Sequence, residues 1–249
     1  MIFRQLFEPL SSTYTYLIGC EETGQAVLVD PVYPAWERDA DLLRSLGLSL
    51  MATVETHVHA DHITSALKLK SELGSQIIYP VLSQCEGADA VAVENKALQV
   101  GSVRVVPIAT PGHTDDHLAY QVDDRLLTGD ALLIDGCGRT DFQNGDMSVL
   151  YRSVMEKLYV LPDDTLVYPG HDYQQRCVST IRQEKQRNAR LPADQTLAGF
   201  VAIMSQLDLP YPRFIDHAVP GNQACGVCPK NLPEELQNYC TQMTQSMQG

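Results

Sequence analysis

The sequence lacks any long hydrophobic run. No stretch of about 18 consecutive apolar residues occurs, so we expect no membrane-spanning helix. The first nine residues show neither the apolar core of a signal peptide nor the Arg- and Ser-rich pattern of a transit peptide. Internal repeats, low-complexity segments and Gly/Ser-rich linkers are also missing. We therefore expect a single domain over residues 1–249, located in the cytoplasm and not associated with a membrane.

Basic residues are scarce and scattered. The 18 Lys and Arg residues are outnumbered by 31 Asp and Glu residues, which gives a formal net charge of −13. A surface this acidic repels phosphates, and no Lys/Arg cluster offsets the repulsion. These features exclude a nucleic-acid partner and a nuclease activity, and they leave a small molecule as the expected partner.

Cysteines are too few and too irregular for a disulfide framework. The seven cysteines are an odd number scattered along the chain, which favours a reducing compartment. Cys225 and Cys228 form a lone CxxC without a second CxxC or a nearby histidine, so a structural zinc site is not favoured. The thiols leave open a non-catalytic metal-binding or sulfur-sensing protein as a hypothesis of a different class.

The apolar residues alternate between strand-like and helix-like spacing. Strands are predicted over residues 13–20, 25–30, 52–55, 76–79, 103–109, 118–122, 125–128 and 166–168. Helices are predicted over residues 36–46 and 63–73 and from an N-cap at Asp146, and the tail from residue 172 onward is predicted to be helical. In the tail, an apolar stripe is assigned to core packing; it consists of Phe200, Ile203, Met204 and Leu207. This pattern alone indicates an α/β or α+β fold.

Metal-binding residue types follow the ends of four predicted strands. In chain order they are His57, His59, Asp61 and His62, then His113, then Asp130, then His171. Strand ends are rigid on one side and open on the other, which suits side chains that must hold fixed distances. Imidazole and carboxylate together bind zinc, manganese or iron, and the absence of cysteine from the cluster disfavours a purely structural zinc site. The sequence therefore predicts a metal centre.

These motifs carry a family resemblance. The segment HVHADH at residues 57–62 resembles the HxHxDH signature of the metallo-β-lactamase superfamily, and His113, Asp130 and His171 match its remaining metal positions in order. The resemblance implies an αββα sandwich of two mixed β-sheets flanked by helices. It places the metal-site core at about residues 13–171 and a family-specific helical segment at residues 172–249. Such a fold does not by itself determine the reaction.

A second tract separates two branches of that superfamily. GCGRTDFQ at residues 136–143 resembles the persulfide dioxygenases, whereas glyoxalase II shares only the GCGR part. The tail segments at residues 171–173, 214–216 and 218–227 also resemble the persulfide dioxygenases, and glyoxalase II has a separate helical domain there. The resemblance implies an oxidoreductase that uses O₂ to oxidise glutathione persulfide to sulfite and glutathione.

The resemblance further implies one Fe(II) per chain, bound by His57, His113 and Asp130. Two imidazoles and one carboxylate form a facial triad that leaves open positions where the persulfide sulfur and O₂ meet. The other metal-type residues are then expected to orient the ligands or water; they are His59, Asp61, His62 and His171.

Three residues are expected at the substrate. Arg139 suits a two-point contact with a carboxylate of glutathione. Tyr173 follows the last ligand loop and is expected to hydrogen-bond the substrate, and Cys137 is expected near the pocket. Each has a structural alternative: a salt-bridged arginine, a packed core tyrosine, and a buried inert thiol.

The competing hypothesis is a glyoxalase II-type hydroxyacylglutathione hydrolase. It places a second metal at Asp61, His62 and His171 and uses a metal-bound hydroxide without oxygen. The sequence does not fix the preferred persulfide or the oligomeric state, although a homodimer is a common state for such enzymes.

Overall fold

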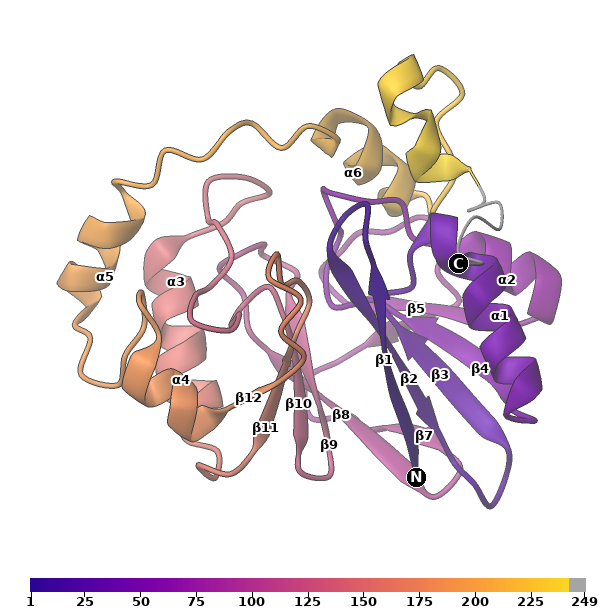
Figure 1. The fold of residues 1–249 in the computed structure, drawn as a ribbon, viewed down its shortest axis with the longest axis horizontal. Helices are drawn as coiled ribbons and strands as arrows, with labels where there is room; N and C mark the ends of the chain where they lie inside the picture. Colours follow the sequence, from indigo (N-terminus) through magenta and orange to yellow (C-terminus); the bar gives the residue numbers. More distant parts are fainter. Residues whose placement is uncertain (242–249) are drawn as a thin grey trace.

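The computed structural model describes residues 1–241. Two six-stranded sheets pack face to face, and helices cover the outer face of each (Figure 1). This is the expected αββα sandwich with mixed sheets. Within the described residues, every helix is too short or too polar to cross a membrane.

The first sheet has the strand order β1-β2-β3-β4-β5-β6. Its strands are β1 (Ile2–Glu8), β2 (Thr13–Gly19), β3 (Gln25–Val29), β4 (Ser49–Val54), β5 (Gln76–Pro80) and β6 (Ala90–Ala92). Strands β1 to β3 are antiparallel and β3 to β6 run parallel. The short 3-10 helix η1 (Tyr33–Ala35) leads into α1 (Trp36–Ser45), which covers the outer face together with α2 (Ala66–Leu73).

The second sheet has the order β12-β11-β10-β9-β8-β7. Its strands are β7 (Leu98–Val100), β8 (Val103–Ala109), β9 (Leu118–Val122), β10 (Arg125–Gly129), β11 (Leu166–Pro169) and β12 (Ser179–Thr180). Only β10 and β11 are parallel neighbours. The outer face is covered by α3 (Met147–Arg152), which continues into the π-helix η2 (Ser153–Leu158), and by α4 (Ile181–Arg187) and α5 (Leu197–Met204).

The central core lies between the two sheets. Tyr16, Ile18 and Val54 of the first sheet pack against Tyr120 and Leu127 of the second, and all five side chains are buried. Burying an aliphatic or aromatic side chain of this size stabilises the fold by roughly 1.5–3 kcal/mol. Side chains two residues apart in a strand point to the same face of the sheet. Apolar residues at alternate positions, such as Tyr16 and Ile18, therefore form one apolar face.

The predicted elements are found, with differences at their ends. The helix predicted over residues 63–73 begins at Ala66. The residues before it instead form a turn, in which the Thr64 backbone N–H donates to Asn222 Oδ1 at 2.9 Å and Thr64 Oγ1 accepts from the Ala66 N–H at 3.2 Å. Strands β1, β6, β7 and β12 were not predicted.

The tail is less helical than predicted. Residues 172–178 form a loop before β12, and after α5 the chain runs without regular structure to α6 (Ile215–Gln223) (Figure 1). The second interruption has a physical cause, because Pro210 and Pro212 remove backbone donors and disfavour helix in the residues before them. The chain then forms the 3-10 helix η3 (Glu234–Cys240).

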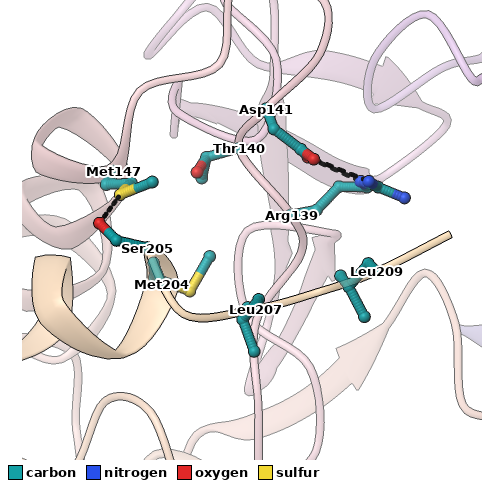
Figure 2. A pocket seen from close by; sticks show the side chains of 8 residues that line it. All are labelled: Arg139, Thr140, Asp141, Met147, Met204, Ser205, Leu207 and Leu209. Atoms are coloured by element: carbon teal, nitrogen blue, oxygen red, sulfur yellow. Dashed lines mark hydrogen bonds and ion pairs between the residues drawn. The ribbon is translucent and has the colours of Figure 1, made fainter. Parts of the chain in front are cut away.

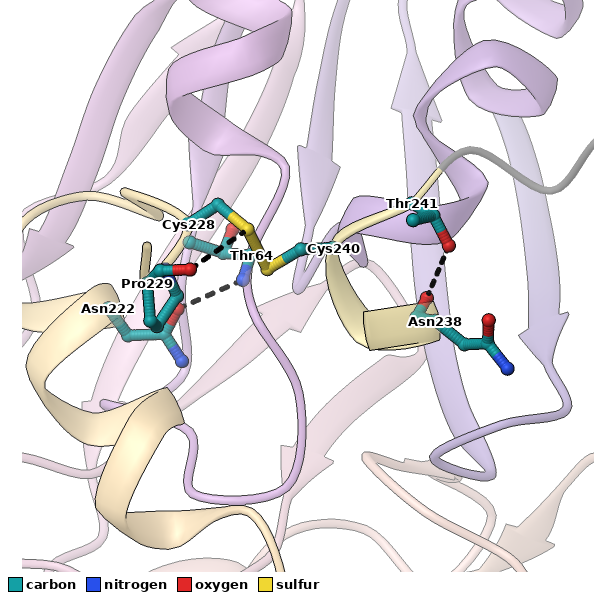
Figure 3. The surroundings of a disulfide bond; sticks show 7 residues. All are labelled: Thr64, Asn222, Cys228, Pro229, Asn238, Cys240 and Thr241. Atoms are coloured by element: carbon teal, nitrogen blue, oxygen red, sulfur yellow. Dashed lines mark hydrogen bonds between the residues drawn. A yellow bond between two sulfur atoms is a disulfide. The ribbon is translucent and has the colours of Figure 1, made fainter. Parts of the chain in front are cut away.

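One disulfide bond joins Cys228 to Cys240 across a sequence separation of 12 residues (Figure 3). The sequence did not predict this bond. Five cysteines remain free, so there is no disulfide framework. The CxxC spacing did not reveal the pairing, because the partner of Cys228 is Cys240 of η3 and not Cys225.

Candidate metal centre

The four polar motifs meet at one edge of the sandwich. His57 follows β4, His113 follows β8, Asp130 follows β10 and His171 follows β11. The loops join the two sheets directly: Thr13 and His171 form an isolated bridge, and the Tyr14 N–H donates to Gly170 O at 2.8 Å. The edge where the sheets meet therefore carries all of the predicted metal-type residues.

The donor atoms of His57, His113 and Asp130 lie within 4.8 Å of one another. His113 Nε2 is 3.5 Å from Asp130 Oδ2, and the rings of His57 and His113 meet edge to face with centroids 4.9 Å apart. Two imidazoles and one carboxylate thus converge on one point from three strand ends, a donor set that suits a divalent transition metal.

Hydrogen bonds fix which nitrogen of His57 faces that point. The Thr56 hydroxyl donates to Asp30 Oδ2 at 2.9 Å, so its oxygen accepts the bond from His57 Nδ1 at 2.9 Å. Nδ1 therefore carries the proton, and Nε2 keeps its lone pair for a metal. Burial and then the neighbouring imidazoles hold the pKa of His57 well below its usual value, which keeps the ring neutral.

His113 and Asp130 are held in the same way. His113 Nδ1 donates to the backbone carbonyl of Arg139 at 2.6 Å, which leaves Nε2 free to bind a metal. Asp130 Oδ1 accepts from His171 Nδ1 at 2.7 Å, and Oδ2 is the oxygen that faces His113. The Asp130 backbone N–H donates to His117 Nε2 at 3.0 Å.

His171 bridges two carboxylates. Nδ1 donates to Asp130, and Nε2 donates to Asp61 Oδ2 at 2.8 Å. Burial alone would lower the pKa of His171, but the charges of Asp130 and Asp61 raise it well above its usual value. Because both ring nitrogens have carboxylate partners, His171 completes the hydrogen-bond shell of Asp130 in this structure and offers no free lone pair.

A second convergence involves His59, Asp61 and His62, whose donor atoms also lie within 4.8 Å of one another. His59 Nε2 donates to Asp30 Oδ1 at 3.1 Å, and His62 Nδ1 is 3.1 Å from Asp61 Oδ2. Among residues 1–241, His59 Nδ1 and His62 Nε2 are buried nitrogens without a hydrogen-bond partner. Buried polar atoms are normally satisfied, so these two nitrogens fit a site that receives a cation or water.

Arg139 has partners within the chain. Nε and Nη2 each lie 2.7 Å from an oxygen of Asp141, and Nη1 donates to Pro210 O at 2.8 Å. The ion pair borders a cavity of about 160 Å³ between this loop and the end of α5, where Met147 and Ser205 lie opposite it (Figure 2). This geometry matches the structural alternative for the guanidinium, so a contact with substrate remains a prediction.

The other two predicted substrate residues lie in opposite environments. Tyr173 is 79 % exposed, and its ring stacks near that of His171 with centroids 6.4 Å apart, so it stands at the mouth of the site and not in a packed core. Cys137 is buried in the core under α3 and α5, and its Sγ lies 3.9 Å from Met204 Sδ. This placement matches the alternative of a buried thiol, so a contact of Cys137 with substrate remains a prediction.

Two residues that hold the segment of residues 56–62 were not predicted from the sequence. Asp30, at the end of β3, accepts from the Thr56 backbone N–H at 2.7 Å and from the side chains of Thr56 and His59. Its left-handed backbone, with φ of 50°, turns the carboxylate back toward the site. Asn222 donates to His59 O and His62 O at 2.9 and 2.8 Å. The sequence offered a signal for Asp30, because it is an aspartate at the end of an apolar strand. It offered no signal for Asn222.

Comparison with known proteins agrees with this architecture. The family model of the metallo-β-lactamase superfamily matches residues 9–100 and 93–171. A di-iron-bound crystal structure, that of TTHA1623, has a TM-score of 0.62 at 26 % identity, covering 76 % of this chain and 98 % of that one. The chain belongs to the metallo-β-lactamase superfamily.

Relatives with higher sequence identity to this chain show which family within the superfamily it belongs to. The chain is 46 % identical to human mitochondrial persulfide dioxygenase ETHE1 over 230 residues, covering 91 % of this chain and 89 % of that one. The crystal structure of ETHE1 from Myxococcus xanthus has a TM-score of 0.88 at 49 % identity, covering 91 % and 100 %. A hydroxyacylglutathione hydrolase from Polaromonas is 34 % identical, with coverage of 64 % and 62 %. The chain is therefore a member of the persulfide dioxygenase family.

Proposed function

We propose that the protein is a mononuclear iron dioxygenase that converts glutathione persulfide to glutathione and sulfite. Glutathione persulfide, O₂ and water give glutathione, sulfite and two protons, which balances atoms and charge. The observation that carries the proposal is the convergence of His57, His113 and Asp130 within 4.8 Å. Membership of the persulfide dioxygenase family supports the reaction class.

The chain's own residues fit such an ion. Both imidazoles present Nε2 to the ion, because each Nδ1–H already donates to an oxygen. His57 Nδ1–H donates to Thr56 Oγ1, and His113 Nδ1–H donates to the Arg139 carbonyl. When bound there, Fe(II) would supply adjacent open coordination positions for a persulfide sulfur and O₂. His171 holds Oδ1 of Asp130, so the carboxylate presents its other oxygen to the ion.

The loop after Asp130 is proposed to position the thiol half of the substrate. Its Arg139 carbonyl fixes His113, and Arg139 is the one Lys or Arg among residues 131–146. We propose that a glutathione carboxylate competes with Asp141 for the Arg139 guanidinium. The Asp141 side chain is 53 % exposed, so the carboxylate of the substrate can take its place. Tyr173, exposed beside His171, is proposed to hydrogen-bond the substrate.

The decisive experiment couples metal analysis to oxygen uptake. Protein purified without air should contain about one iron per chain and consume O₂ only when glutathione persulfide is added. The His113→Ala variant should lose both iron and O₂ uptake, while Cys177→Ser, a change at an exposed free thiol, should keep both. Stoichiometric zinc with no oxygen consumption would refute the proposal.

A binuclear hydrolase is the second candidate, and one observation favours it. Within residues 1–241, Nδ1 of His59 has no hydrogen-bond partner and lies 4.0 Å from Asp61 Oδ1, so a second cation would find donors there. Against it, Nε2 of His171, the third predicted ligand of that metal, already donates to Asp61. Two metals per chain and hydrolysis of S-lactoylglutathione under nitrogen would identify this function.

A further inference from the structure

Two free thiols lie in contact behind the metal-binding loop. Cys85 follows β5, Cys225 follows α6, and their Sγ atoms are 3.2 Å apart. Cys225 is buried, whereas Cys85 is partly exposed and therefore reachable from solvent. A disulfide bond measures about 2.05 Å, so an approach of about 1.1 Å would join the two sulfurs. Such contact across 140 residues of sequence is a feature of the folded chain alone.

The two thiols differ in acidity. A hydrogen bond from Cys85 lowers the pKa of Cys225, and the same contact raises the pKa of Cys85. The pair therefore consists of a more acidic thiol, Cys225, and a less acidic neighbour, Cys85. Thiolate character and access to solvent together determine cysteine reactivity. Here Cys225 is the more acidic sulfur and Cys85 is the more accessible one.

The pair also touches the residues that hold the metal-binding loop. Cys85 Sγ lies 3.3 Å from the backbone oxygen of Asn222. The side chain of Asn222 accepts from the Thr64 N–H at 2.9 Å and donates to His59 O and His62 O. The backbone oxygen of Cys225 accepts from the N–H of Leu67 in α2 at 3.1 Å. A bond between the thiols would thus form against the loop that carries His59 and His62.

We propose that Cys85 and Cys225 form a reversible dithiol site that exchanges with low-molecular-weight disulfides. With Cys225 as the thiolate, the Cys85 sulfur attacks one sulfur of the external disulfide while its proton passes to the Cys225 sulfur, and the first external thiolate leaves. The Cys225 sulfur then attacks the Cys85 sulfur and displaces the second thiolate, which takes the proton. The protein loses two electrons as its own disulfide forms, and the external disulfide gains them as it is cleaved.

The test is a peptide map of the full chain, and it does not depend on turnover. Protein is equilibrated in buffers of glutathione and glutathione disulfide, quenched with acid, alkylated and digested with trypsin without reduction. Cys85 lies in the tryptic peptide 71–96 and Cys225 in the peptide 214–230. We expect these peptides to be joined in the oxidising buffers and separated again by dithiothreitol.

Matched variants locate the bond. Cys85→Ser should abolish the joined species, and Cys177→Ser should leave it unchanged, because that thiol is exposed and outside the pair. Cys228→Ser should also keep it, since Cys228 is bonded to Cys240 and shares the tryptic peptide of Cys225.

Three outcomes would overturn the proposal. The first is a glutathione adduct on Cys85 that never closes onto Cys225. The second is a bond from Cys85 to Cys228, identified by fragmentation of the joined peptides. The third is a pair that stays fully reduced in a buffer that glutathionylates Cys177. The wild-type map distinguishes all three, so the conclusion does not require that a variant folds.

Discussion

His117 Nε2 accepts a 3.0 Å hydrogen bond from the backbone N–H of Asp130. Its Nδ1–H must then donate to Thr110 Oγ1, at 2.8 Å, and its ring stacks on His57 with centroids 5.0 Å apart. Burial lowers the pKa of His117 to about 3, so the imidazole is neutral and can accept at Nε2. One side chain thus holds two of the proposed iron ligands. Gly129 permits this approach, because a Cβ there would lie 2.5 Å from His117 Nε2.

Replacing His117 should weaken iron binding without removing a ligand. His117→Phe keeps an aromatic ring against His57 but leaves the Asp130 N–H without its acceptor, and we expect iron affinity to fall by about 10–100-fold. His117→Gln retains an acceptor and should lose less. Competition with a chelator measures both affinities, and equal binding by His117→Phe and the unchanged protein would contradict the positioning role.

Removal of Asn222 should destabilise the whole fold. Asn222→Ala deletes three hydrogen bonds to the loop and leaves buried backbone groups of His59, His62 and Thr64 unsatisfied. We expect the free energy of unfolding to fall by about 2–5 kcal/mol, because a buried polar group left unpaired costs about 1–3 kcal/mol. Urea unfolding of the metal-free protein gives the value. Asn238→Ala, at an exposed position in η3, is the control and should change it by less than about 0.5 kcal/mol.

Asp61 separates the one-metal and two-metal models. Asp61→Asn removes the carboxylate between His62 and His171 but touches none of the three proposed iron ligands. Under the mononuclear proposal the variant should still bind about one iron per chain and keep part of its O₂ uptake. Metal analysis gives the iron content per chain, and an oxygen electrode gives the O₂ uptake. A wild-type content of two metals that drops to one in the variant would support the hydrolase.

Cys137 should resist alkylation in the folded protein. Burial raises the pKa of its thiol to about 11, so at pH 8 only about 0.1 % of it is thiolate. Exposed Cys177 should react with iodoacetamide at pH 8 while Cys137 reacts only after denaturation. Raising the pH toward 11 increases the thiolate fraction, and the Cys137 rate should rise with it. Equal labelling of the two cysteines at pH 8, measured by peptide mass, would show that Cys137 is accessible.

Local patterns predicted much of the fold and of the site. The strands at Val103–Ala109 and Leu118–Val122 were predicted with the observed bounds, because apolar runs between turn residues mark buried strands. Asp146 was predicted as an N-cap, and its side chain accepts from the Val149 N–H at 2.8 Å. The residues proposed to bind iron were visible because each follows a strand that ends at the same edge.

Contacts distant in sequence were beyond such patterns. The neighbours of Asn222 and the partner of Cys228 depend on how the tail folds back, which no local spacing encodes. Strand β1 also escaped, because its residues Ile2–Glu8 lie at the sheet edge and most are only partly buried, so they show no clear alternation. The contact of Arg139 with Pro210 was missed for the same reason, since Pro210 lies 71 residues away.

Thr13 has a consequence for the order of assembly. Its hydroxyl lies 3.0 Å from His171 Nε2, although 158 residues separate them. The first residue of β2 therefore contacts the segment that follows β11, beside Asp130. During synthesis the amino-terminal sheet can form early, but His171 reaches Thr13 only after the last core strand has emerged. The hydrogen bond from His171 to Asp130 is therefore completed late, and it reports that both halves of the sandwich have docked.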